Sequence, residues 1–183
     1  MSSMKTWIAL FRGINVGGNH PLPMKELKLL LEQEGCSDVQ TYIQSGNAIL
    51  RSKVTDTARL AKRITSAVGK SHGFEPHVFV CSIDDFENAV AGNPFPEAIE
   101  TPKSLHLFFL DDLPKAPNWP AFDALRTMNE RFELRDRHFY LYTPEGFGIS
   151  KLSGRAEKLL GVTATARNWR TITTLLDMAR EYP

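Results

Sequence analysis

Strand and helix patterns follow one another in the order strand, helix, strand, strand, helix, strand within the first 82 residues. Apolar residues recur at helical spacing in two segments, and runs rich in β-branched and aromatic residues lie before, between and after them. This order predicts a ferredoxin-like arrangement, an antiparallel sheet with two helices on one face. The strands are expected at residues 6–12, 39–44, 48–52 and 77–82, and the helices at residues 23–34 and 60–68.

The second half of the chain repeats part of this order. A strand is expected at residues 104–110, a helix at 119–128, and a hairpin that joins 131–136 to 138–142. Two helices are expected after this hairpin, the last with Trp169 on its apolar face. The fold class is therefore predicted to be α+β, with two tandem ferredoxin-like (α-β plait) subdomains, each an antiparallel sheet with helices packed on one face.

A proline-bearing stretch between Ser82 and Pro102 is typical of a boundary between subdomains. Residues 1–82 are expected to form the first ferredoxin-like subdomain. Residues 83–183 are expected to form the second α-β plait subdomain, with an extra C-terminal helix.

Charge and hydropathy exclude several classes of function. Lys and Arg total 22 against 21 for Asp and Glu, so the chain lacks the general positive field that holds nucleic acid. Nucleic acid stays open as a partner only through a local basic patch. The apolar run from Trp7 to Phe11 is too short for a signal-peptide core, and no run reaches the length of a membrane span. We expect a cytoplasmic location and no membrane partner, with the oligomeric state left open.

No complete catalytic or metal-binding constellation is present in the sequence. The five histidines are scattered, and Cys36 and Cys81 have neither metal-ligand spacing nor a nucleophile motif. No catalytic residue, metal or cofactor is therefore predicted.

The loop Arg12-Gly13-Ile14-Asn15-Val16-Gly17-Gly18-Asn19 lies between a predicted strand and a predicted helix. Backbone N–H groups in such a loop can hold an anion. Gly13 and Gly18 fit the spacing of a P-loop, but Asn19 and His20 stand where that motif needs Lys and then Ser or Thr, which excludes P-loop nucleotide hydrolysis. In the alternative interpretation the glycines and asparagines only permit tight turns, and Arg12 forms an internal salt bridge.

Two further clusters carry polar groups. Gln44-Ser45-Gly46-Asn47 is a hairpin turn that brings short hydrogen-bonding groups together. The stretch from Thr165 to Thr171 is expected to begin the last helix, with Thr165 or Asn168 as N-cap. Arg167 and Arg170 would oppose the helix dipole there, and an anionic ligand would balance their charge. The alternatives are a plain turn for the first cluster and internal ion pairs for the second.

Three separated blocks match a known family in the right order. They are Ala9-Leu10-Phe11-Arg12-Gly13-Ile14-Asn15-Val16-Gly17-Gly18, Thr41-Tyr42-Ile43-Gln44-Ser45-Gly46-Asn47 and Arg167-Asn168-Trp169-Arg170-Thr171, with Met24, Leu27 and Asn93-Pro94-Phe95 between them. In these residues, and over nearly its whole length, the chain resembles the bacterial family of unknown function numbered 1697. The resemblance implies two tandem α-β plait subdomains and brings no activity with it.

We therefore expect a binding module for a small anionic or nucleotide-like ligand, held in a groove between the subdomains. Two other classes stay open: an enzyme of unrecognised type, which would use a titratable residue such as His20, and a nucleic-acid or protein interaction surface, on which Tyr140 and Tyr142 could stack bases. The predicted ligand-binding residues are Arg12, Gly13, Asn15, Gly17, Gly18, Gln44, Ser45, Asn47, Arg167 and Asn168.

Overall fold

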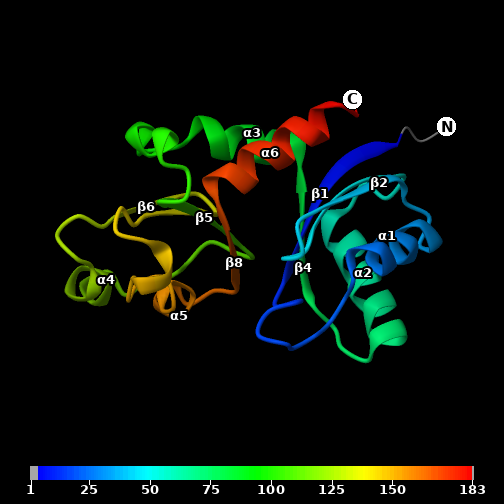
Figure 1. Ribbon diagram of the computed structural model, residues 1–183, viewed down its shortest axis with the longest axis horizontal. Helices are drawn as coiled ribbons and strands as arrows, with labels where there is room; N and C mark the ends of the chain where they lie inside the picture. Colours follow the sequence, from blue (N-terminus) through cyan, green and yellow to red (C-terminus); the bar gives the residue numbers. More distant parts are fainter. Residues whose placement is uncertain (1–3, 183) are drawn as a thin grey trace. The chain divides into compact units, whose positions relative to one another are not determined.

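The computed structural model describes residues 4–182 and contains two four-stranded antiparallel sheets (Figure 1). The strand orders are β2-β3-β1-β4 and β6-β7-β5-β8, so each sheet has the ferredoxin-like order, and the predicted fold class is confirmed. The strands are β1 (Lys5–Arg12), β2 (Ser37–Tyr42), β3 (Asn47–Ser52), β4 (His77–Ser82), β5 (Leu105–Leu110), β6 (Arg131–Arg135), β7 (His138–Tyr142) and β8 (Ala164–Asn168). The helices are α1 (Met24–Gln33), α2 (Thr57–His72), α3 (Ile83–Ala91), α4 (Trp119–Leu125), α5 (Ala156–Leu160) and α6 (Trp169–Arg180), with 3-10 helices at Pro96–Glu100 and Phe147–Ile149.

The chain divides into two compact units. The first unit consists of two segments, the chain up to Glu87 and the chain from Thr174 onward. The second unit is Asn88–Thr173. The division falls inside α3 and inside α6, so both helices contribute to both units. The subdomain boundaries expected from the sequence, 1–82 and 83–183, stay predictions.

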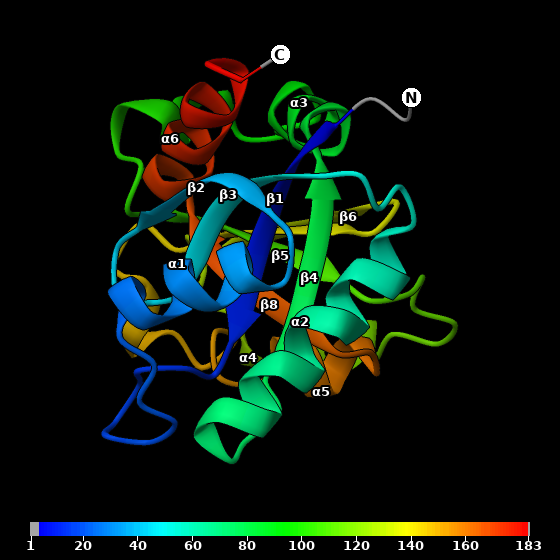
Figure 2. The same cartoon turned by 90° about the vertical axis from the view of Figure 1, so that its right-hand side faces the viewer.

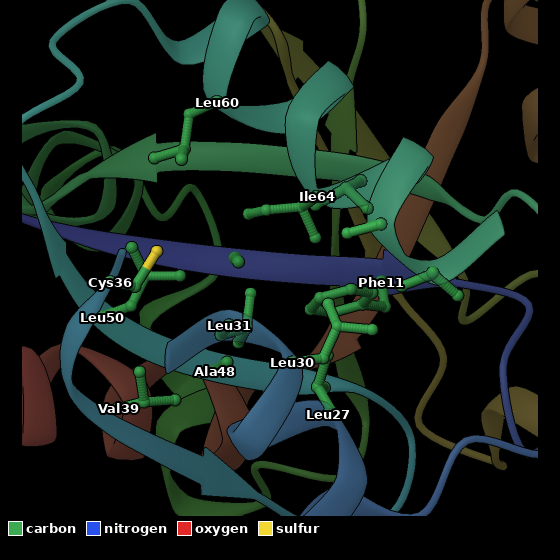
Figure 3. Close-up of a cluster of buried hydrophobic side chains, with 14 of the residues drawn as sticks. Phe11, Leu27, Leu30, Leu31, Cys36, Val39, Ala48, Leu50, Leu60 and Ile64 are labelled. Atoms are coloured by element: carbon green, nitrogen blue, oxygen red, sulfur yellow. The ribbon is translucent and has the colours of Figure 1, made fainter. Parts of the chain in front are cut away.

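The core of the first unit lies between its sheet and the helices α1 and α2, which cover one face (Figure 2). The apolar stripe of α1 is Leu27, Leu30 and Leu31, and these residues are buried. The α2 stripe includes Leu60 and Ile64, and Figure 3 shows both stripes converging over the central strand β1. Burial of such stripes at helical spacing is what the sequence pattern predicts.

The ends of α2 are fixed by local chemistry. The carboxylate of Asp56 accepts a hydrogen bond from the Arg59 backbone N–H at 2.9 Å, which makes Asp56 an N-cap. Gly73 ends the helix with a φ of 75°, a left-handed conformation that glycine adopts without strain. These two residues therefore set the two ends of α2.

The C-terminal segment is tied to the sheet of the first unit. The Tyr182 hydroxyl accepts a hydrogen bond from the Gln40 side chain on β2, and the Tyr182 carbonyl accepts one from the Thr6 hydroxyl on β1 at 2.5 Å. Arg180 donates to Glu87 through Nε at 3.0 Å and Nη2 at 2.8 Å. The segment that contains Arg180 and Tyr182 is therefore held by hydrogen bonds within the first unit.

The second unit has its own aromatic core. Phe108 on β5, Phe139 on β7 and Phe122 on α4 pack together with Leu152 and Leu160, all buried. The Phe122 ring centroid lies 5.2 Å from that of Phe139, and the Phe108 centroid lies 5.7 Å from it. These are the separations at which offset and edge-to-face aromatic pairs are stabilising.

Of the two N-caps predicted for the last helix, Thr165 is wrong, because this residue lies in the strand β8, and Asn168 is confirmed. Ala164–Asn168 pairs with β5, Arg167 opposite Leu107, and α6 begins only at Trp169. Asn168 is the residue that caps the helix, since its Oδ1 accepts the Thr171 N–H at 2.9 Å. A five-residue segment with two alanines and one arginine has little strand propensity, and only its pairing with β5 makes it a strand.

Candidate functional site

Asn15 joins the glycine-rich loop, residues 13–19, to the hairpin turn, residues 44–47. Its Nδ2 donates to the Leu22 carbonyl at 2.8 Å and to the Gln44 carbonyl at 2.9 Å, and its Oδ1 accepts the Leu22 N–H at 2.7 Å. Asn15 has a φ of 55°, which asparagine tolerates better than most residues. The side chain predicted to bind a ligand is thus engaged in holding two predicted blocks together.

Close packing beneath the loop fixes it a second time. Ile14 is fully buried, and the Phe11 N–H donates to the Gly46 carbonyl at 2.9 Å. A Cβ on Gly46 would lie 2.6 Å from Ile14 Cδ1 and 2.8 Å from Phe11 Cβ. Only glycine fits at this position, where φ is also +85°.

Replacement of Gly46 by alanine is expected to lower the free energy of unfolding by about 1–3 kcal/mol, because it adds steric overlap to an unfavourable φ. Gly18→Ala is the matched control: its φ of +76° is similar, but no atom lies within 4 Å of the added Cβ. Urea unfolding of both variants measures the difference. Equal losses would show that packing against Ile14 contributes nothing.

The tip of the loop is open. Val16 and Asn19 form an isolated β-bridge, with the Asn19 N–H donating to the Val16 carbonyl at 3.1 Å, and Gly17 and Gly18 turn the chain with φ values of 58° and 76°. Both glycines are exposed, and no hydrogen bond to their amides is found within residues 4–182. Arg12 is also exposed, at the end of β1. The loop thus has a fixed base and a tip with accessible N–H groups.

The turn beside the loop contains one strained residue. Ile43 has a φ of 50°, which is unusual for a β-branched side chain and ends β2 at Tyr42. Asn47 is fully buried and donates to the Tyr42 carbonyl at 3.0 Å, while Gln44 and Ser45 are exposed. Asn47 therefore shapes the turn, and Gln44 and Ser45 are the side chains that a ligand could reach.

Arg167 and Asn168 lie in the second unit. Arg167 is only 8% exposed, and its Nη1 donates to the Thr165 hydroxyl and to the Ala166 carbonyl, both at 2.8 Å. Because Arg167 is in a strand, the argument that its charge opposes the α6 dipole does not apply to it. The eight other predicted residues all belong to the first unit, where the structure brings the loop and the turn together.

His106 was not among the predicted residues. It lies on β5 directly opposite Asn168, and its ring stacks on Phe147 with a centroid separation of 3.6 Å. Within the described residues its Nδ1 is buried without a hydrogen-bond partner, and burial lowers the pKa of His106 to about 4. A lone histidine in a strand gives no sequence signal, since only the pairing of β5 with β8 places it beside Asn168.

The tyrosines considered for stacking bases are used inside the second unit. Tyr140 is buried, its hydroxyl donates to the Ala89 carbonyl at 2.6 Å, and burial raises its pKa to about 12. The Tyr142 ring lies 5.9 Å from that of Phe95, and the Arg131 guanidinium lies 4.9 Å from the centroid of each of these two rings. Tyr140 is therefore not accessible to a base, and the partly buried Tyr142 already packs against an arginine and a phenylalanine.

Thiol and metal chemistry receive no support from the geometry. Cys36 and Cys81 are buried and unbridged, and burial raises the pKa of the Cys36 thiol, which disfavours the reactive thiolate. Residues 4–182 contain no group of three or more His, Cys, Asp or Glu side chains that could hold a metal ion. Over the same residues no helix is long and apolar enough to cross a membrane.

A shallow surface hollow of about 420 Å³ lies in the second unit. None of the predicted ligand-binding residues lines it. Its lining is Gly154, Glu157, Lys158, Gly161, Val162 and Thr163.

Comparisons with known proteins give a fold and a family. The solved structure of a conserved bacterial protein from Streptococcus pneumoniae has a TM-score of 0.77 and 22% identity, and the match covers 97% of this chain and 99% of that one. At that identity the likeness concerns the fold. No curated protein matches the sequence. The family model described as "Protein of unknown function (DUF1697)" matches residues 4–140, which include the loop and the turn but not Arg167, and the chain belongs to this family.

Proposed function

We propose that the first unit binds a small anionic ligand at the glycine-rich loop. The observation that carries the proposal is the contrast within the loop: Asn15 and Ile14 fix its base, while Gly17 and Gly18 expose amides that make no hydrogen bond within residues 4–182. A preformed loop with exposed N–H groups binds an anion without a large ordering cost.

Arg12 supplies the charge for this site. It is exposed directly before the loop, and a guanidinium donates strong, often bidentate, hydrogen bonds to carboxylate and phosphate oxygens. The open space around Gly13, Gly17 and Gly18 also matters, since no atom lies within 4 Å of a Cβ at any of them. These glycines are not required for packing, and they leave the backbone accessible to a ligand.

Gln44 and Ser45 favour a ligand that is more than a bare ion. Both are exposed in the turn that Asn15 holds against the loop. An amide and a hydroxyl can bind sugar hydroxyls or the edge of a base, so we include sugar phosphates and nucleotides among the ligands proposed. Arg167 and Asn168 stay predicted members of the site, and variants at these two positions test them separately.

The test is a thermal-shift screen of the full chain with pyrophosphate, sugar phosphates, nucleotides and short RNA, followed by titration of each ligand that binds. A ligand at a hundredfold excess over its Kd is expected to stabilise the protein by about 2.7 kcal/mol. Arg12→Gln is expected to weaken binding about tenfold or more, as for the loss of a charge-assisted hydrogen bond.

Arg59→Gln is the matched control, because Arg59 is an exposed arginine on α2 and its loss changes the net charge equally. Equal weakening by both variants would mean that general electrostatics, rather than the loop, attracts the ligand. If no small anion shifts the melting temperature and RNA binds in a salt-sensitive way, the nucleic-acid alternative replaces the proposal.

A further inference from the structure

The imidazole of His20 is held against the beginning of the glycine-rich loop. Its Nδ1 lies 3.2 Å from the Gly13 carbonyl oxygen. A carbonyl can only accept a hydrogen bond, so Nδ1 must carry the proton of this bond. In the neutral ring Nε2 is then the unprotonated nitrogen, and no partner for it is found in the described part of the chain.

Two further contacts hold His20, one through its ring and one through its backbone. His20 stacks on Phe74, with the ring centroids 4.6 Å apart and the planes 18° from parallel. The His20 carbonyl accepts the Asn15 N–H at 3.1 Å, and the φ of His20 is 50°. Gly13 and Phe74 therefore position the imidazole, and Asn15 holds the backbone of the same residue.

His72 lies against the same phenylalanine but is used differently. Its Nε2 lies 2.9 Å from Glu26 Oε2, its Nδ1 lies 2.7 Å from the Ser71 hydroxyl, and its ring centroid is 6.3 Å from that of Phe74. Both nitrogens of His72 thus have partners inside the protein, and its side chain is 17% exposed. His20 is exposed and has one nitrogen left for a ligand.

We propose that His20 contacts the anion bound by the glycine-rich loop and takes up a proton when the anion binds. This inference rests on the proposed function and specifies it: the ligand is an oxyanion of the phosphate type, and its affinity rises as the pH falls. Protonation adds a positive charge and turns Nε2 into an N–H donor, and an anion favours that form. The surrounding elements carry these titratable or charged groups: Arg12 before the loop, His72 and Glu75 beside Phe74, and Glu26 on α1.

Sulfate is the probe, because it remains a dianion from pH 6 to pH 8 and any pH dependence comes from the protein. Its Kd is measured by NMR titration of the full chain at pH 6.0 and pH 8.0, for the wild type, His20→Asn and the matched control His72→Asn. Asparagine tolerates the positive φ at position 20, so the first variant is expected to fold. The anion favours the protonated imidazole of His20, so the wild type and H72N are expected to bind sulfate about fivefold more tightly at pH 6.0 than at pH 8.0. H20N is expected to bind sulfate equally at both values.

Three results would overturn the inference. Sulfate binding that is independent of pH in the wild type, or that keeps its full pH dependence in H20N, removes His20 from the site and leaves the proposed function standing. The absence of sulfate binding at both pH values removes the inference and the anion site together. Retention of the pH dependence in H72N and its loss in H20N support the assignment.

Discussion

Acidification from pH 7 to pH 5 is expected to lower the free energy of unfolding by about 2 kcal/mol through His106 alone. Burial lowers the pKa of His106 to about 4 in the folded chain, against 6.5 for the unperturbed group. The unfolded chain therefore takes up this proton first as the pH falls. Above pH 6.5 the titration of His106 does not lower the free energy of unfolding. Between pH 6.5 and pH 4 the free energy of unfolding falls, and the total loss is about 3 kcal/mol once the pH is below both pKa values.

Urea unfolding between pH 5 and pH 7.5 measures this effect in a range above the titration of most carboxylates. The variant His106→Gln removes the titrating group and is expected to flatten the curve over this interval. His138→Gln is the matched control, since His138 belongs to the neighbouring strand β7 of the same sheet. A curve for H106Q that keeps the wild-type slope would show that His106 is not the group responsible.

Leu175→Ala is expected to destabilise the protein by about 2–5 kcal/mol, the range for deleting a fully buried leucine side chain and leaving a cavity. Leu175 lies in the part of α6 that belongs to the first unit, and it is fully buried. Since Tyr182 and Arg180 anchor the same segment, the surroundings have little freedom to collapse into the cavity. The loss is expected to appear in urea unfolding of the full chain.

Asp177→Ala is the control for this prediction. Asp177 lies two residues further along α6, and its side chain is 77% exposed. Its replacement is expected to change the free energy of unfolding by no more than about 0.5 kcal/mol. Similar small effects of L175A and D177A would contradict the role given to the C-terminal segment in the first unit.

Much of the fold could be predicted from the sequence because most helices and strands have a local sequence pattern that identifies them. The stripes Leu27-Leu30-Leu31 and Leu60-Ile64 identify α1 and α2, and the apolar run before Arg12 identifies β1. The strand β8 could not be found in this way. Its Ala and Arg residues carry no alternating apolar pattern, and long-range pairing with β5 decides its conformation.

In the candidate site, too, some features could be predicted from the local sequence and others depend on the tertiary structure. The glycines and asparagines of the loop and the turn could be identified because turns select these residue types. The roles of Asn15 and Asn47 depend on which carbonyl each side chain meets, and that follows from the tertiary structure. The position of the His20 ring could not be predicted, because its contact with Phe74, 54 positions later, has no signature in the sequence.

The most direct test of the anion site is an NMR titration of the ¹⁵N-labelled full chain with pyrophosphate, which follows each backbone amide. We predict that the largest shifts fall on residues 12–20 and 44–46, with Gly17 and Gly18 among them, and that Arg12→Gln reduces them. Saturable shifts confined to other surfaces, or none at concentrations that saturate ordinary phosphate sites, would contradict the proposal that this loop is the binding site.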